Sequence, residues 1–281
     1  MRTRGLRLAS HVHSAWSDDC GWTLARLRRH LGACGFDGAL VCDHDRTMTE
    51  DRRQQLVEEC RRITAAGFVM VPGVEYQDPD HVVHLPVFGD LPFYGRSAEI
   101  GDVLRAAQDA GAVSVFAHPV RADAWSRFDP NWVPLLTGLE VWNRKYDGVQ
   151  PNAWAVRTSR EHGLVPFVGL DFHGPRQLFP LAMVLEAGTP RTWAGVLEAL
   201  REGRCRAEAF GRPLQAFTHG RLADTVRRAE DLRKHLAPRV RTVEHWVRRQ
   251  RPGSSLRSRP DSGTTPAPPG RSQAGERHDE Y

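Results

Sequence analysis

Short apolar segments alternate along the chain with segments of helical period. Apolar runs predict β-strands at residues 6–12, 38–42, 68–74, 81–88, 112–117, 138–142 and 164–170, with one more at 181–185. Apolar residues at three- and four-residue steps predict helices at 23–34, 50–65, 99–110, 151–162 and 192–201. Pro151 suits a helix start, and Gly111 and Gly163 suit helix ends. This alternation is typical of an α/β fold with a mostly parallel sheet. Seven strands before residue 174 favour a closed or nearly closed barrel, although an open sheet fits the same pattern.

The C-terminal part of the chain has a different character. Apolar residues recur at three- and four-residue steps from Leu222 to Val247, which predicts one amphipathic helix or two halves meeting at Pro238. Such a helix either docks on the main domain or binds a partner protein or anionic surface. From residue 252 onward Pro, Gly and Ser supply 14 of 30 residues, which predicts disorder. We therefore divide the chain into a domain at 1–211, a basic helical extension at 212–251 and a tail at 252–281.

The net charge of +5 comes from this extension and not from the main domain. Residues 221–251 carry ten basic and four acidic side chains, the last 30 residues are balanced, and residues 1–220 therefore have a net charge of −1. A main domain without a basic excess disfavours nucleic acid as the partner.

Cysteine content and hydropathy narrow the class of protein further. The five cysteines form no CxxC pair, so a disulfide framework or Cys-rich zinc site is not expected. The first ten residues contain no apolar signal core, and no apolar stretch approaches the ~20 residues of a membrane span. These features predict a cytoplasmic protein.

Many of the thirteen histidines fall at the ends of predicted strands. His11 and His13 end the first strand, and residues two apart in a strand face the same side. Other histidines and carboxylates lie at or near the later strand ends: Asp43, His44, Asp45, Glu75, His81, His84, His118, Glu140, Asp171 and His173. In parallel α/β architectures, active sites are built at that edge. One HxH pair is weak evidence, but the whole set predicts a converged metal cluster.

The ligand types indicate which metals and which chemistry to expect. Nitrogen and oxygen ligands without thiolate suit Zn, Mn or Fe(II). Six histidines and three carboxylates are too many for one ion, so we expect two or three divalent ions that share a bridging carboxylate, with Glu75 as the central candidate. Such a cluster generates a hydroxide at neutral pH and neutralises the oxygens of a displacement. The cluster therefore predicts ester hydrolysis, foremost at phosphorus.

The ordered motifs resemble those of the PHP (polymerase and histidinol phosphatase) metallohydrolases. The resemblance runs from about residue 8 to residue 174, or to about 211 with the last barrel elements. The segments that carry it are, in order, His11-Val12-His13-Ser14 with Ser17-Asp18, Cys42-Asp43-His44-Asp45, Pro72-Gly73-Val74-Glu75, His84, Ala117-His118-Pro119 and Gly169-Leu170-Asp171-Phe172-His173-Gly174. This resemblance implies a distorted (β/α)7 barrel with a trinuclear metal site at its C-terminal rim.

The resemblance also implies a set of ligands. It assigns His11, His13, Glu75 and Asp171 to one metal, Asp18, His44 and His173 to a second, and Glu75, His84 and His118 to a third. In this scheme Asp171 also orients or deprotonates the bridging water, and His173 counts with it among the catalytic residues.

Two positions qualify this ligand set. Ser10 stands where the family usually has Asp, a residue that supports the site rather than binding the metal. His81 competes with His84, but the segment 85–89 after His84 resembles the family's His-led strand.

Basic side chains that follow the motifs are candidates for contact with a phosphate. These are Arg46, Arg121, Arg144, Lys145 and Arg176, and Arg121 is the best single choice because it comes soon after His118 and Pro119. We count Arg121 with Asp171 and His173 among the catalytic residues. The leading hypothesis is a metal-dependent phosphoesterase in which a metal-bridging hydroxide attacks a small phosphomonoester or phosphodiester. The alternatives are a hydrolase of carboxyl or carbamate esters on the same cluster, and a non-catalytic metal-bearing scaffold whose basic helix binds a partner.

Overall fold

The computed structural model describes residues 4–250, and it describes side chains as far as residue 235. The tail predicted at 252–281 lies outside the described residues. Within the described part, no helix combines the length and the apolar character needed to cross a bilayer. The described residues divide into two units, one up to His235 and one from Leu236 onward. The boundary that we predict after residue 211 stays a prediction.

Between residues 4 and 250, twelve strands form two sheets of six. The first sheet contains, in spatial order, β12 (Arg212–Pro213), β11 (Cys205–Ala209), β10 (Leu181–Leu185), β1 (Arg7–Val12), β2 (Gly38–Val41) and β4 (Val69–Val71). The second contains β3 (Asp43–His44), β5 (Gly73–Gln77), β6 (His84–Phe88), β7 (Val113–Phe116), β8 (Gly138–Asn143) and β9 (Val165–Gly169). The mixed α/β class is therefore confirmed, whereas closure of the strands into a seven-stranded barrel stays a prediction.

The expectation of a mostly parallel sheet is wrong. The pairs β5–β6, β6–β7, β1–β10, β10–β11 and β11–β12 are antiparallel. The parallel pairs β1–β2, β2–β4, β3–β5, β7–β8 and β8–β9 are no more numerous. Only six residues lie between Gln77 at the end of β5 and His84 at the start of β6, and a connection this short joins antiparallel neighbours.

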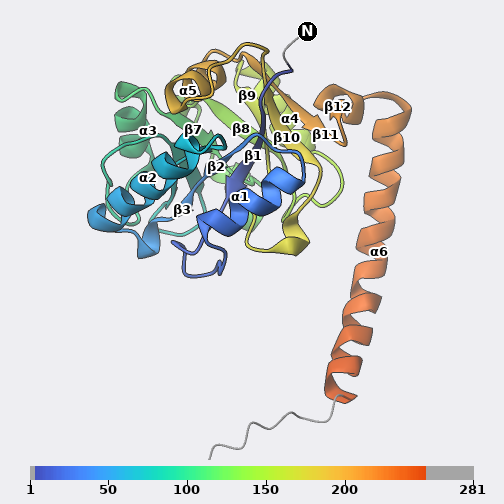
Figure 1. Cartoon of the computed structure of the whole chain (residues 1–281). Coiled ribbons are helices and arrows are strands. Elements are labelled where there is room, and N and C mark those ends of the chain that lie inside the picture. The colour runs from blue at the N-terminus through green and yellow to red at the C-terminus, as the bar shows by residue number, and fades with distance from the viewer. Residues whose placement is uncertain (1–3, 251–281) are drawn as a thin grey trace, which may run out of the picture. The chain divides into compact units, whose positions relative to one another are not determined.

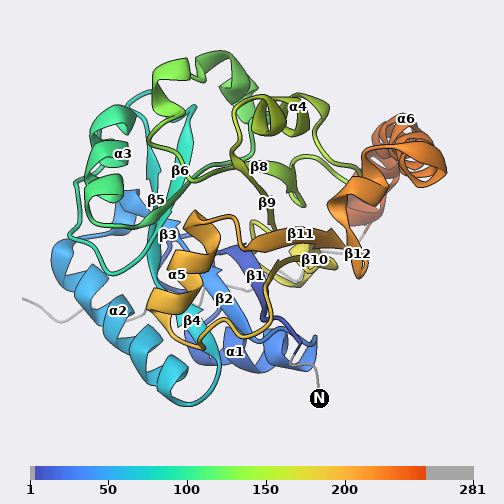
Figure 2. The same ribbon diagram turned by 90° about the horizontal axis from the view of Figure 1, so that it is seen from above.

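Most helices lie outside the strands, as Figure 2 shows in the view from above, and one lies across the end of the strands that faces the viewer. They are α1 (Leu24–Ala33), α2 (Glu50–Ala65), α3 (Ile100–Asp109), α4 (Ala153–Glu161), α5 (Trp193–Arg201) and α6 (Gly220–Gln250). Side-chain oxygens of Thr23, Thr49, Asn152 and Thr192 cap four of their N-termini, which satisfies backbone donors that a helix start leaves unpaired. The buried faces of α1, α2 and α3 supply leucine, valine and isoleucine to one continuous core.

The two ends of the strand assembly differ. Helix α5 packs against β4, β7 and β10, strands of both sheets, and it lies at the upper end of the molecule in Figure 1. Strand β1 begins at that end and runs away from it, so His11 and His13 lie near the opposite end. The end far from α5 is therefore where the predicted cluster has to be sought.

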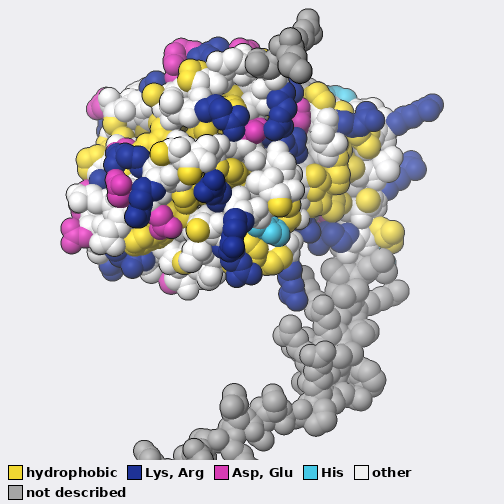
Figure 3. Space-filling model, in the orientation of Figure 1, with side chains coloured by type: hydrophobic (Ala, Val, Ile, Leu, Met, Phe, Trp, Pro, Cys, Tyr) yellow, Lys and Arg dark blue, Asp and Glu magenta, His cyan; other side chains and the backbone are white. Residues whose placement is uncertain are grey.

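Helix α6 is continuous from Gly220 to Gln250, and Pro238 does not divide it into two. The first part of α6 contacts the loop after β8 through Glu230. This buried side chain accepts a hydrogen bond from the backbone N–H of Val149 at 3.2 Å. Figure 3 shows acidic and basic side chains intermingled on the side of α2 and α3, whereas Lys and Arg predominate on the side of α6.

Candidate metal centre

The predicted histidines converge where several strands end. His13 follows β1, His44 ends β3, His118 follows β7, and Asp171 and His173 follow β9. His84 lies at the start of β6 rather than at its end. Because β6 is antiparallel to β5 and His84 lies opposite Gln77, the start of β6 reaches the same edge as the end of β5. All of these side chains except that of His173 are buried.

Five imidazoles surround the carboxylate of Glu75, which is itself only 1 % exposed. The nitrogen-to-oxygen distances from Glu75 are 3.3 Å to His11, 3.5 Å to His13, 2.9 Å to His44, 3.0 Å to His84 and 3.2 Å to His118. Two carboxylate oxygens cannot accept well-directed hydrogen bonds from five rings at once. Glu75 is therefore the geometric centre of the cluster, in the position expected of a bridging ligand.

A second group gathers around Asp19 at the rim. Its Oδ2 lies 3.2 Å from Nε2 of His44 and 3.1 Å from Nε2 of His173, and His13 belongs to the same group. The resemblance assigns this place to Asp18, but the structure turns Asp18 toward solvent, where Nε of Arg46 donates to it at 2.8 Å. The structure thus brings Asp19, and not Asp18, against His44 and His173.

Asp171 links the two groups. Its buried carboxylate lies 3.2 Å from Nδ1 of His173 and 3.6 Å from Nε2 of His13. The ammonium of Lys145 donates to Oδ1 of Asp171 at 3.2 Å. Lys145 is therefore in direct contact with a side chain of the cluster, and so is Arg46, whose Nη2 donates to Oδ2 of Asp19 at 3.0 Å.

The backbone at the cluster is held in conformations that most residues avoid. His11, His118 and Asp171 have φ angles of 57°, 25° and 48°. Such left-handed conformations cost on the order of 1–3 kcal/mol each in non-glycine residues and concentrate at functional sites. Hydrogen bonds from the N–H of Phe172 to the carbonyl of His11, and from the N–H of His13 to that of Phe172, hold this arrangement.

The charges of the cluster shift several pKa values strongly. Burial raises the pKa of Glu75, but the imidazoles around it outweigh burial and hold that pKa well below its usual value. Burial lowers the pKa of His44 and of His173, but their carboxylate partners raise both to about 9. Burial lowers the pKa of His84 to about 4. The cluster therefore holds ionised carboxylates among imidazoles that differ in their affinity for protons.

The residues fit a metal cluster on their own geometry. Within the described part of the chain, six buried polar atoms of the cluster have no hydrogen-bond partner, namely Nε2 of His11, His13 and His84, Nδ1 of His44 and His118, and Oε2 of Glu75. Buried polar atoms are almost always paired, so a group of unpaired ones calls for a missing partner. Imidazole nitrogens and carboxylate oxygens are the ligands of Zn²⁺ and similar ions.

Glu140 is a functional candidate to which the sequence argument gave no role. Its Oε1 lies 3.1 Å from Nδ1 of His11, and its Oε2 accepts hydrogen bonds from the N–H of His118 and the amide of Asn143, each at 2.8 Å. A carboxylate on the outer nitrogen of a histidine fixes the tautomer that leaves the inner nitrogen free for a metal. The sequence places Glu140 among the carboxylates near predicted strand ends, and the structure places it inside β8, but nothing in the sequence distinguishes it from the metal ligands.

The remaining candidates lie farther from the cluster. Nη1 of Arg121 donates to the carbonyl of His81 at 2.7 Å. Nδ1 of His81 lies 3.1 Å from the side-chain oxygen of Gln77, and among the described residues His81 belongs to none of the groups that could hold a metal. Arg144 packs its guanidinium on the ring of Phe179, and Arg176 is exposed in the turn after Gly174. The preference for His84 over His81 thus agrees with the geometry.

Comparisons with known proteins support the fold. No family model and no curated protein matches the chain. Among solved structures, the chain is similar to a two-domain protein of Bacteroides vulgatus described as containing a predicted PHP-like metal-dependent phosphoesterase, with 18% identity and a TM-score of 0.54. The match covers 74% of this chain and 65% of that protein, so the chain spans about two thirds of its length.

PsfC from Pseudomonas syringae is similar as well, with 16% identity and a TM-score of 0.55 over 81% of this chain and 98% of PsfC. The resemblance to PHP-like proteins that the motifs predict is therefore confirmed at the level of the fold.

Proposed function

We propose that the protein is a metal-dependent phosphoesterase that hydrolyses a small phosphomonoester or phosphodiester. The observation that supports this most is the convergence of five imidazoles on the buried carboxylate of Glu75. Similarity in fold to a protein described as containing a PHP-like phosphoesterase adds to it.

The residues that would hold the metal ions follow from the two groups. His11, His13, Glu75 and Asp171 would hold one ion, His44 and His173 with Asp19 a second, and His84 and His118 with Glu75 a third. We propose Asp19 in place of Asp18 because only Asp19 contacts both histidines of its group. Divalent ions in such a site make water acidic enough to act as a nucleophile at neutral pH and neutralise phosphate oxygens.

The chain's own residues would position the reactants. Asp171 is buried and ionised, because the neighbouring imidazoles outweigh burial and hold its pKa well below the usual value. An ionised Asp171 accepts a hydrogen bond from a water molecule and orients it. Lys145 keeps about a third of its side chain exposed beside Asp171, so its ammonium can pair with a phosphate oxygen that enters from solvent. Arg46, on Asp18 and Asp19 at the rim, supplies a second positive charge.

The test combines metal analysis with turnover of an aryl phosphate. Purified full-length protein is expected to carry at least one ion per chain, to release phosphate, and to lose turnover with chelator. His44→Ala is expected to abolish turnover, and His162→Ala serves as the control because His162 lies at the end of α4, outside the cluster. Less than one metal per chain together with unchanged turnover in His44→Ala would remove the basis of the proposal.

A parallel assay with an aryl acetate tests the alternative of carboxyl-ester hydrolysis. Faster turnover of the acetate than of the phosphate at the same metal content would assign the cluster to carboxyl esters. Full metal occupancy without turnover of either ester would favour a metal-bearing scaffold.

A further inference from the structure

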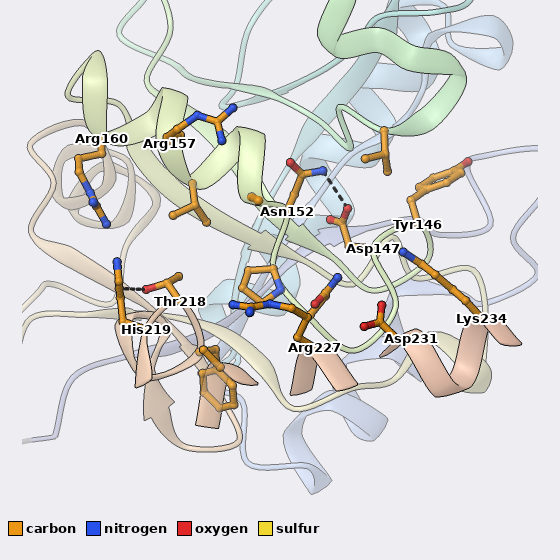
Figure 4. A pocket seen from close by; sticks show the side chains of 17 residues that line it. Tyr146, Asp147, Asn152, Arg157, Arg160, Thr218, His219, Arg227, Asp231 and Lys234 are labelled. Atoms are coloured by element: carbon orange, nitrogen blue, oxygen red, sulfur yellow. Dashed lines mark hydrogen bonds between the residues drawn. The ribbon is translucent and has the colours of Figure 1, made fainter. Parts of the chain in front are cut away.

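A large cavity lies beside the cluster, between the loop after β8 and the helices α4 and α6. Its volume is about 670 Å³, within the range of cavities that bind small organic molecules. Figure 4 shows Arg157 and Arg160 extending from α4, and Arg227 and Lys234 extending from α6. None of these four side chains belongs to the metal centre.

The lining of the cavity is positively charged. Against the four cationic side chains stand two carboxylates, those of Asp147 and Asp231. Arg227 pairs at 3.4 Å with Asp224, and Lys234 lies 3.9 Å from Glu230. Among the side chains that the structure describes, no carboxylate lies within salt-bridge distance of Arg157 or Arg160. The positive charges of Arg157 and Arg160 are therefore available to bind an anionic ligand.

The start of α4 adds to this positive character. Asn152 and Ala153, at its first turn, both line the cavity, and Asn152 uses its side-chain oxygen to cap the N–H of Ala155. The N-terminus of a helix carries a partial positive charge that favours anions. The helix start and the cationic side chains thus line the same cavity, with Arg160 in the last turn of α4.

Other parts of the wall are apolar or aromatic and lead toward the metal centre. Val156, Ala223 and Phe217 line the cavity, which gives an organic group a surface to pack on. Tyr146 lines it too, and its ring centroid lies 4.9 Å from that of His118. One aromatic ring therefore borders both the cavity and the cluster.

We propose that this cavity binds a phosphorylated small organic molecule, with its phosphate on Arg157 and Arg160. Guanidinium groups pair with phosphate oxygens in a bidentate manner, and the apolar wall accommodates the carbon skeleton. Two sources supply this chemistry: a second phosphate on the substrate whose ester bond lies at the metal centre, or a separate phosphorylated ligand. Only the first source rests on the function proposed above.

The first experiment measures binding without catalysis. Butanediol bisphosphate is titrated calorimetrically into full-length protein in excess chelator. We expect saturable binding, and a loss of about tenfold or more in affinity in R157Q/R160Q, because hydrogen bonds between charged groups are strong. R29Q/R62Q is the control, since it removes the same charge from helix faces outside the cavity, where both arginines are exposed. Absence of saturable binding, or equal affinity in R157Q/R160Q and wild type, would overturn the proposal.

The second experiment identifies the source with metal-loaded enzyme. Ethanediol, butanediol and hexanediol bisphosphates are compared with the matching alkyl monophosphates. If the cavity binds the distal phosphate, one bisphosphate has a lower KM than its monophosphate, and R157Q/R160Q removes that preference while R29Q/R62Q keeps it. Binding in chelator without any such preference assigns the cavity to a separate ligand. Absence of turnover of every ester would count against the proposed function alone, because the calorimetric result does not depend on activity.

Discussion

Replacement of Glu140 by glutamine tests whether the contact between the carboxylate of Glu140 and His11 strengthens metal binding at the cluster. The carboxylate of Glu140 is 2 % exposed, and its three partners occupy both oxygens. In Glu140→Gln, the amide oxygen can replace Oε2 and keep the two bonds from His118 and Asn143. The amide N–H group then faces Nδ1 of His11, which has to become an acceptor. This moves the ring proton to Nε2, the atom that faces Glu75 at 3.3 Å.

The expected cost follows from the loss of one supporting carboxylate. Mutation of such partners lowers metal affinity about 10- to 100-fold, which corresponds to about 1.4–2.7 kcal/mol. The measurement is a competition titration between the protein and a chromophoric chelator, with Zn²⁺ or Mn²⁺. Glu208→Gln is the control, because Glu208 on β11 is also buried but pairs with Arg7 and Arg206, neither of which belongs to the cluster.

The result that would refute this reasoning is equally specific. An affinity within about twofold of wild type, in a Glu140→Gln protein that melts at the wild-type temperature, would show that His11 needs no carboxylate support. A loss of affinity in Glu208→Gln as large as in Glu140→Gln would show that buried charge in general, and not this contact, is responsible.

Three further predictions concern neighbouring features. Gly169→Ala is expected to weaken metal binding in the same titration, because a Cβ there would collide with Oε1 of Glu140; unaltered affinity would contradict the packing. Asp19→Asn is expected to lower the metal content measured by mass spectrometry, whereas Asp18→Asn is expected to leave it near the wild-type value, and the reverse order would restore the assignment made from the motifs. Burial raises the pKa of Asp147 to about 7, so ionisation of Asp147 opposes folding. Between pH 5 and pH 8, the free energy of unfolding measured in urea is expected to fall by about 2–3 kcal/mol more in wild type than in Asp147→Asn. Equal pH dependence of the free energy of unfolding in the two proteins would exclude this.

The hydrophobic pattern predicts most elements well because their positions are set by local burial. Helix α2 begins and ends where the pattern places it, and so does β10. Strand β11 escapes prediction because Arg206 and Glu208 interrupt its apolar residues. Strand direction escapes as well, since a run of buried residues reads the same in a parallel or an antiparallel neighbour.

The candidate site also contains some residues whose position the sequence predicts and others whose position it does not. His11 and His13 are predicted together because alternation in a strand fixes which residues share a face. Asp18 and Asp19 lie in a turn, where no such period exists, so the sequence cannot say which one faces His44. Glu140 sits among the strand-end carboxylates, but its role depends on the distance to His11, a residue 129 positions away.

The division of the cluster between the two sheets has a mechanical consequence. His11 and His13 come from the end of β1 in one sheet, whereas Glu75 and His84 belong to the other. Beside the cluster, the backbone of β1 pairs with the segment after β9 through the bridge of Val12 with Phe172 and the hydrogen bond from the N–H of Leu170 to the carbonyl of Ser10. A cation bound by ligands from both sheets would link them, so its binding free energy would also stabilise the folded state against separation of the two sheets.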